Sequence, residues 1–65
     1  MDFMEKAKIR LQSWITHNDH HQKEYEMFAE QLEMANKTDS ARHIREMIEL
    51  NSKSNDCLRQ ALKVL

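Results

Sequence analysis

The sequence predicts an all-α protein: an antiparallel two-helix hairpin that pairs with a second copy into a four-helix bundle. The chain of 65 residues contains no glycine and no proline, so little interrupts a helix. Apolar residues recur at alternating steps of three and four, the spacing of a helix that packs against other helices. One short polar segment, residues 36–40, separates two such stretches. A connection this short makes the two helices antiparallel neighbours within a single domain, residues 1–65.

The first helix is expected over about residues 3–35. Asp2 followed by Glu5 is the pattern of a capped helix start, because a carboxylate before the first turn accepts hydrogen bonds from free backbone N–H groups. We use the word seam for the line of positions along a helix that faces a neighbouring helix. The seam of the first helix starts at its first turn. Its members are Met4, Ala7, Leu11, Trp14, Asn18, His21, Tyr25, Phe28, Leu32 and Ala35. The aromatic members of this seam are expected to anchor the core.

Residues 36–40 are expected to form the turn, and the second helix is expected over about residues 41–64. Asn36 tolerates the left-handed conformation that ends many helices, and the Thr, Asp and Ser that follow are residue types that cap helix starts. The seam of the second helix also steps by three and four. It consists of Ala41, Ile44, Ile48, Asn51, Asn55, Leu58, Leu62 and Leu65.

The second helix has a further apolar stripe beside its seam. The stripe consists of Met47, Leu50, Cys57, Ala61 and Val64. One neighbouring helix cannot cover a face this wide, and a chain this short is marginally stable unless a partner or a metal adds to its core. We therefore expect a homodimer of hairpins, and the alternative is that the stripe binds a different protein.

Each seam is interrupted by polar residues at one level. In the first seam these residues are Asn18 and His21. In the second they are Asn51 and Asn55, which the antiparallel register places opposite the first pair. Buried amides and imidazoles are stable when they hydrogen-bond to one another, and one such layer fixes the register and partner number of a helical bundle. We therefore expect a structural polar layer.

A second interpretation of the same stretch is a metal site. His17 and His21 are four residues apart and Glu24 follows three residues later, so the three side chains point to one side of the helix. Two imidazoles at this spacing with a carboxylate suit Zn or Ni, and His20 would be a spare ligand on the more exposed side. The spacing is not that of an HExxH metalloprotease, because no glutamate directly follows His17.

The composition narrows the class of function. The net charge is −1 with acidic and basic residues interspersed, which argues against binding to nucleic acid. No apolar run is long enough to cross a membrane, and nothing resembles a signal peptide. The single cysteine, Cys57, is typical of a reducing compartment, so a cytoplasmic protein is expected. The sequence offers no catalytic arrangement and a bundle this small has no room for a substrate, so we expect no enzyme activity.

The middle of the first helix resembles a small family of uncharacterised prokaryotic helical-hairpin domains. The matching run is Ser13-Trp14-Ile15-Thr16-His17-Asn18-Asp19-His20-His21, followed by Tyr25, Phe28 and Ala29. That family shows the pattern H-W-I-x-H-N-x-x-H, then an aromatic residue, then an aromatic-Ala pair. Within it His17, Asn18 and His21 match, whereas Ser13 stands where the family has its leading histidine. The resemblance covers about residues 11–65 and implies the hairpin fold, with one of three histidine ligands lacking if the family's histidines form a metal site.

The sequence supports two functional hypotheses. The first is a non-enzymatic interaction module that homodimerises, or docks another protein, through its wide apolar face. In this hypothesis the Asn/His layer sets the register and no cofactor is needed. The alternative is a small protein that binds Zn or Ni through His17, His21 and Glu24.

Overall fold

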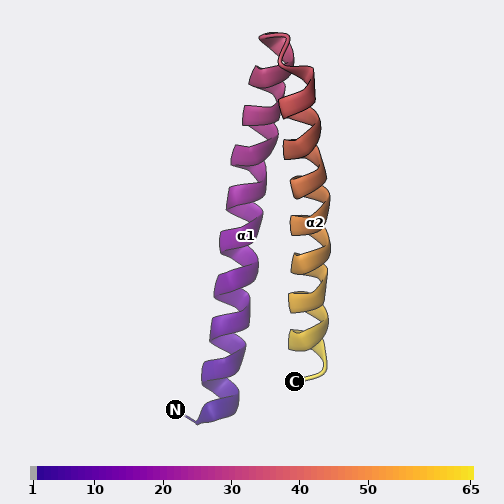
Figure 1. The fold of residues 1–65 in the computed structure, drawn as a ribbon. Coiled ribbons are helices and arrows are strands. Elements are labelled where there is room, and N and C mark those ends of the chain that lie inside the picture. The colour runs from indigo at the N-terminus through magenta and orange to yellow at the C-terminus, as the bar shows by residue number, and fades with distance from the viewer. Residues whose placement is uncertain (1) are drawn as a thin grey trace.

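The computed structural model describes residues 2–65 as two long helices joined by a tight turn (Figure 1). Helix α1 spans Phe3–Met34 and helix α2 spans Thr38–Lys63. The helices lie side by side and run in opposite directions, so both ends of the chain lie at the end of the hairpin away from the turn. The prediction of an all-α antiparallel hairpin is confirmed. Neither described helix is long and apolar enough to cross a membrane.

The turn forms around the asparagine that the sequence singled out. Asn36 has a left-handed backbone φ of 62°. Its N–H bonds to the carbonyl of Glu33 at 3.1 Å, and the N–H of Lys37 bonds to the carbonyl of Leu32 at 2.8 Å. These two bonds satisfy carbonyl groups that the end of a helix otherwise leaves unpaired. Asparagine is one of the few residues that adopt this conformation at low cost, so the predicted role of Asn36 is confirmed.

The two helices start in different ways. The Asp2 carboxylate caps α1 as predicted, by accepting a hydrogen bond from a backbone N–H of the first turn at 2.9 Å. Helix α2 begins at Thr38, before the expected residue 41, and Lys37 ahead of it makes no side-chain capping bond. The chain already reverses direction over residues 35–37. Residues 38–40 are therefore free to form the first turn of α2 rather than the connection.

The face of α1 that packs on α2 differs from the predicted seam at alternate positions. The buried and half-buried residues of α1 are Ala7, Leu11, Ile15, Asn18, His21, Gln22, Tyr25, Ala29 and Leu32. Leu11, Asn18, Tyr25 and Leu32 pack on α2 as predicted. Between them, the packed face passes through Ile15, Gln22 and Ala29, each one residue after the predicted seam position. Trp14 and Phe28 are consequently 51% and 50% exposed, so the expectation that they anchor the core of one hairpin is wrong.

The size of the side chains explains this shift near the turn. Ala29 of α1 and Ala41 of α2 are both buried there. Side chains this small let two helix backbones come close together, and the two ribbons converge toward the turn (Figure 1). The aromatic ring of Phe28 is too large for so narrow a gap, so the helix turns its alanine inward. The seam of α2 is buried or half-buried at each predicted position except Leu65.

Little of the chain is buried in a single hairpin. Among residues 2–65 the buried ones are Ala29, Ala41 and Asn55. The radius of gyration is 15.2 Å, against about 11 Å for a compact domain of this length. The accessible surface is 5284 Å², against about 4,400 Å² for a folded monomer of 7.8 kDa. A single hairpin therefore leaves an unusually large surface uncovered.

Candidate functional site

Asn55 is the centre of a hydrogen-bonded layer between the helices. It is 1% exposed, and its side chain contacts three groups of α1. Its oxygen accepts a hydrogen bond from the Asn18 amide at 3.2 Å. Its nitrogen donates to the Ile15 carbonyl at 3.1 Å and to the Asp19 carboxylate at 2.7 Å. Within residues 2–65 every buried side-chain nitrogen or oxygen has a partner, so the layer avoids the desolvation cost of unpaired polar atoms.

Asn51 extends this layer by one turn of α2. Its Nδ2 donates to the backbone carbonyl of Asn18 at 3.3 Å and to Oε1 of Gln22 at 3.4 Å. The structure thus brings together three of the expected members, namely Asn18, Asn51 and Asn55. His21 lies outside the layer, because the seam of α1 passes through Gln22 instead.

Two ion pairs join the helices along one side of the hairpin. Arg59 donates to both carboxylate oxygens of Asp19 at 3.2 Å, and Arg45 makes two hydrogen bonds to Glu33, at 2.7 and 2.8 Å. The hydrogen bonds from Arg45 lower the pKa of Glu33, and the same contact raises the pKa of Arg45. We call the side that these four residues occupy the charged face.

The opposite side of the hairpin is apolar. Positions 14, 21 and 28 lie about 140° around α1 from positions 19, 26 and 33, and positions 47, 54 and 61 lie about 160° around α2 from positions 45, 52 and 59. The two seams lie in between, so these positions are on the side away from the ion pairs. We call this side the apolar face. Its apolar members are Trp14, Phe28, Met47 and Ala61, with Leu50 and Cys57 at its outer edge on α2, and all of them are exposed except the half-buried Met47. Val64 lies about 180° around α2 from the buried Asn55 and therefore points away from α1.

His17 and His21 meet on this side at the middle of α1. Their Nε2 atoms are 2.9 Å apart, and their ring planes are nearly perpendicular at 89°. The other nitrogen of His21, Nδ1, lies 3.5 Å from Oε2 of Glu24, and the His21 ring stacks on Tyr25 with 5.9 Å between centroids. A proton on the nitrogen that faces Glu24 leaves the Nε2 lone pair of His21 turned toward His17. In that arrangement Nε2 of His17 donates the hydrogen bond that Nε2 of His21 accepts, and the two nitrogens share one proton.

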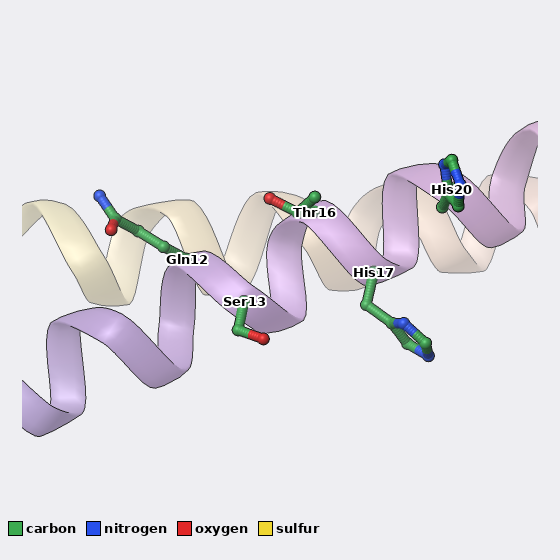
Figure 2. A pocket seen from close by; sticks show the side chains of 5 residues that line it. All are labelled: Gln12, Ser13, Thr16, His17 and His20. Atoms are coloured by element: carbon green, nitrogen blue, oxygen red, sulfur yellow. The ribbon is translucent and has the colours of Figure 1, made fainter.

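The other expected ligands lie elsewhere around this pair. Glu24 contacts the His21 nitrogen that faces away from His17. His20 and His17 point to different sides of α1, as Figure 2 shows. Among residues 2–65 no three His, Cys, Asp or Glu side chains are grouped so that they could hold a metal ion.

Figure 2 also shows a shallow surface depression beside these histidines. It is lined by Gln12, Ser13, Thr16, His17 and His20. All of its lining side chains come from α1, so no wall from α2 encloses it. An open depression on one helix offers little to hold a small molecule.

The fold and the layer together define a two-helix hairpin module with a hydrogen-bonded asparagine centre. The chain belongs to the family described as Domain of unknown function (DUF8180), whose model matches residues 3–65. This agrees with the expected membership of a small domain family without an assigned function. No curated protein and no solved structure matches the chain.

Sequence reasoning missed three participants in the site, Asp19, Gln22 and Arg59. Asp19 and Arg59 carry opposite charges and lie near one level of the antiparallel hairpin, so their pairing could have been found from the register. Gln22 is polar and lies four residues after Asn18, which was also a usable signal. None of the three residues occupies a predicted seam position.

Proposed function

We propose that this protein is a non-enzymatic interaction module whose apolar face binds the same face of a second copy. The observation that supports this most is the combination of a very small core with large exposed apolar side chains. Trp14, Phe28 and Leu50 are 51%, 50% and 66% exposed in a single hairpin. Exposed apolar side chains gathered on one side are typical of an association site, because burying them removes apolar area from water.

The size of the apolar face supports a dimer. The hairpin measures 51 × 16 Å along its two longer axes, so one broad side has an outline of about 800 Å². A standard protein interface buries about 800 Å² of accessible surface per partner, so a broad side is large enough to form one. The ion pairs of the charged face stay in water when the apolar faces meet, so pairing does not require their desolvation.

The asparagine layer has a separate part in this function. It fixes the register of α1 against α2, and so determines which side chains appear together on the apolar face. A hairpin that slipped by one turn would leave Asn55 without partners in a buried position, which is unfavourable. The layer therefore supports a single arrangement of the binding surface.

Self-association is tested by sedimentation equilibrium and thermal melting over about a hundredfold range of concentration. A dimer gives twice the chain mass of 7.8 kDa. Its melting temperature rises with concentration, because association stabilises only the folded state. A chain that stays monomeric with an unchanged melting temperature would overturn the proposal and leave a different protein as the occupant of the apolar face.

The contact between His17 and His21 favours a second candidate function, the binding of Zn or Ni. The two Nε2 atoms are hydrogen-bonded to each other at 2.9 Å, so a metal ion that displaces the shared proton finds two imidazole ligands on one side of α1. The test is a thermal melt of metal-stripped protein with and without each metal, beside His17→Ala/His21→Ala. A rise in melting temperature that the double variant loses would support metal binding, since a metal that binds the folded state stabilises it. No rise in the wild type would overturn it.

A further inference from the structure

We propose that two hairpins pack antiparallel through their apolar faces, and that His17 and His21 of both copies together bind one transition-metal ion such as Zn²⁺. This inference rests on the self-association proposed above and adds the orientation, the position of the two-fold axis and a shared metal site. One chain offers two imidazole nitrogens, whereas a structural zinc ion takes four ligands. The site is therefore incomplete without the second copy.

The position of the histidine pair along α1 is the first argument. Helix Phe3–Met34 has its centre between residues 18 and 19, and residue 19 lies midway between His17 and His21. When two such helices lie antiparallel over their full length, the two-fold axis passes through their centres. Each histidine pair then lies at the axis, opposite the same pair of the other copy.

The direction of the two histidines agrees with this position. At about 100° per residue, His17 and His21 lie about 100° and 60° around α1 from Asn18, both toward the apolar face. Asn18 lies on the seam and points at α2. The line midway between the two histidines is therefore about 80° from the seam and leads straight out of the apolar face. The histidine pair therefore points toward the place that a second copy on the apolar face would occupy.

The stripe on α2 gives an independent argument, because it is self-complementary about Ser54. Met47 and Ala61 each lie seven residues from Ser54, on opposite sides of it, and Leu50 and Cys57 lie four and three residues away. An antiparallel copy places Met47 opposite Ala61, and it brings Leu50 and Cys57 to one level at the edge of the interface. The large Met47 then meets the small Ala61, which fills the interface without voids.

The packing of the hairpin brings the centre of the histidine pair on α1 and the centre of the stripe on α2 to the same level. Asn18 bonds to Asn55 and Asn51 bonds to Gln22, so the register places residue 19 beside residue 54. One two-fold axis therefore serves α1 and α2 together. Packing within a single hairpin does not require the two centres to coincide, so their coincidence supports a symmetric antiparallel pair.

The geometry of the histidine pair suits a tetrahedral ion. Bonds of about 2.0–2.1 Å to nitrogen place two ligand atoms of such an ion about 3.3 Å apart. The Nε2 atoms of His17 and His21 are 2.9 Å apart, so a small rotation of the rings admits the ion. Glu24, beside Nδ1 of His21, keeps that ring's proton on the far nitrogen and leaves the Nε2 lone pair for the metal. We assign Glu24 this positioning role, and one such carboxylate per copy balances the charge of a divalent ion.

Cobalt(II) is the probe for the shared site, because its visible absorbance reports tetrahedral coordination. Titration of metal-stripped protein is expected to saturate at one cobalt per two chains, without a thiolate charge-transfer band. His17→Gln/His21→Gln is expected to lose the absorbance. His20→Gln/His43→Gln, the same substitution at two histidines outside the site, is expected to keep it. Saturation at one cobalt per chain, or the absence of a tetrahedral spectrum, would overturn the shared site.

Spin labels measure the orientation of the two copies. Lys6→Cys in a Cys57→Ala background places one label per chain, thirteen residues from the axis at residue 19. At 1.5 Å per residue, antiparallel copies set the two labels about 40 Å apart. Parallel copies hold them at one level, within about 25 Å across the bundle. A distance in the shorter range would overturn the antiparallel arrangement.

Sedimentation of the same samples separates the two ways of failing. If metal-free protein is a dimer but binds no cobalt, the shared metal site is overturned and the self-association stands. If the chain is monomeric at every concentration, with and without cobalt, both are overturned. A chain that dimerises only when cobalt is added supports the shared site directly.

Discussion

At Asn55 a carboxamide is almost fully excluded from water, yet each of its polar atoms has a partner on α1. The amide offers one acceptor group and two donor hydrogens. In the hairpin these meet the Asn18 donor and the oxygens of Ile15 and Asp19. The position thus requires the chemistry of an amide and not only its size.

We expect Asn55→Asp to lower the free energy of unfolding by about 3 kcal/mol, because a buried carboxylate would face two oxygens with no donor to offer. Asn51→Asp is the matched control, since Asn51 is half-buried and its contacts are longer, at 3.3 and 3.4 Å. There we expect a loss of about 1 kcal/mol. Urea unfolding followed by circular dichroism gives both values. Equal losses at the two positions would contradict the central role of Asn55.

The asparagines of the layer follow directly from the predicted seams, whereas the choice between His21 and Gln22 does not. Asn18, Asn51 and Asn55 interrupt apolar seams, and buried polar groups must find one another. His21 and Gln22 lie three and four residues after Asn18, and both are polar. Which of them faces α2 depends on the rotation of α1 about its own axis, and the step pattern leaves that rotation open.

At the level of the helices, the predicted seam of α2 is the one that packs, except at Leu65, although a second stripe with the same spacing lies beside it. In α1 both Trp14 and Ile15 are apolar, so two neighbouring stripes fit the same spacing. The packed structure selects the stripe of Ile15 and Ala29, since the small Ala29 fits opposite Ala41 near the turn. The spacing of apolar residues does not tell how closely two helices approach. That distance determines which of the two stripes of α1 packs against α2.

The ion pair between Glu33 and Arg45 makes helix pairing sensitive to acid. Because the fold lowers the pKa of Glu33, the stabilisation is complete above the ordinary range of a carboxylate and is lost as pH falls through the lowered pKa. We expect the melting temperature of the wild type to fall more than that of Glu33→Gln between about pH 5 and about pH 3. The effect is modest, because both side chains are nearly half exposed.

Thermal melts at a series of pH values check this expectation. Glu49→Gln is the control, because it makes the same substitution at an exposed glutamate of α2. Its melting temperature is expected to follow the wild type across the range. Parallel pH profiles for the wild type and Glu33→Gln would mean that the ion pair adds nothing to the pairing of the helices.

At the scale of the whole molecule, the proposed dimer predicts which exposed apolar side chains are needed for self-association. The place of a side chain on the surface is expected to decide this more than its hydrophobicity does. Leu50 and Met27 are almost equally exposed, at 66% and 64%. Leu50 lies on the apolar face, whereas Met27 lies on the side of α1 away from α2. We therefore expect Leu50→Lys to abolish self-association in sedimentation experiments, because the charge would be buried between the copies. Met27→Lys is expected to leave it unchanged, and equal effects of the two variants would contradict the assignment of the face.

The difference between the two faces of the hairpin also limits how far assembly can go. A hairpin that was apolar on both sides would offer a fresh surface after each addition and would stack into open layers. Here the second side carries the Asp19–Arg59 and Glu33–Arg45 ion pairs, which are satisfied within one chain and remain hydrated. Once the apolar faces have met, both outward sides are charged. We therefore expect the proposed assembly to close at two copies, so that its size stays constant at higher concentration.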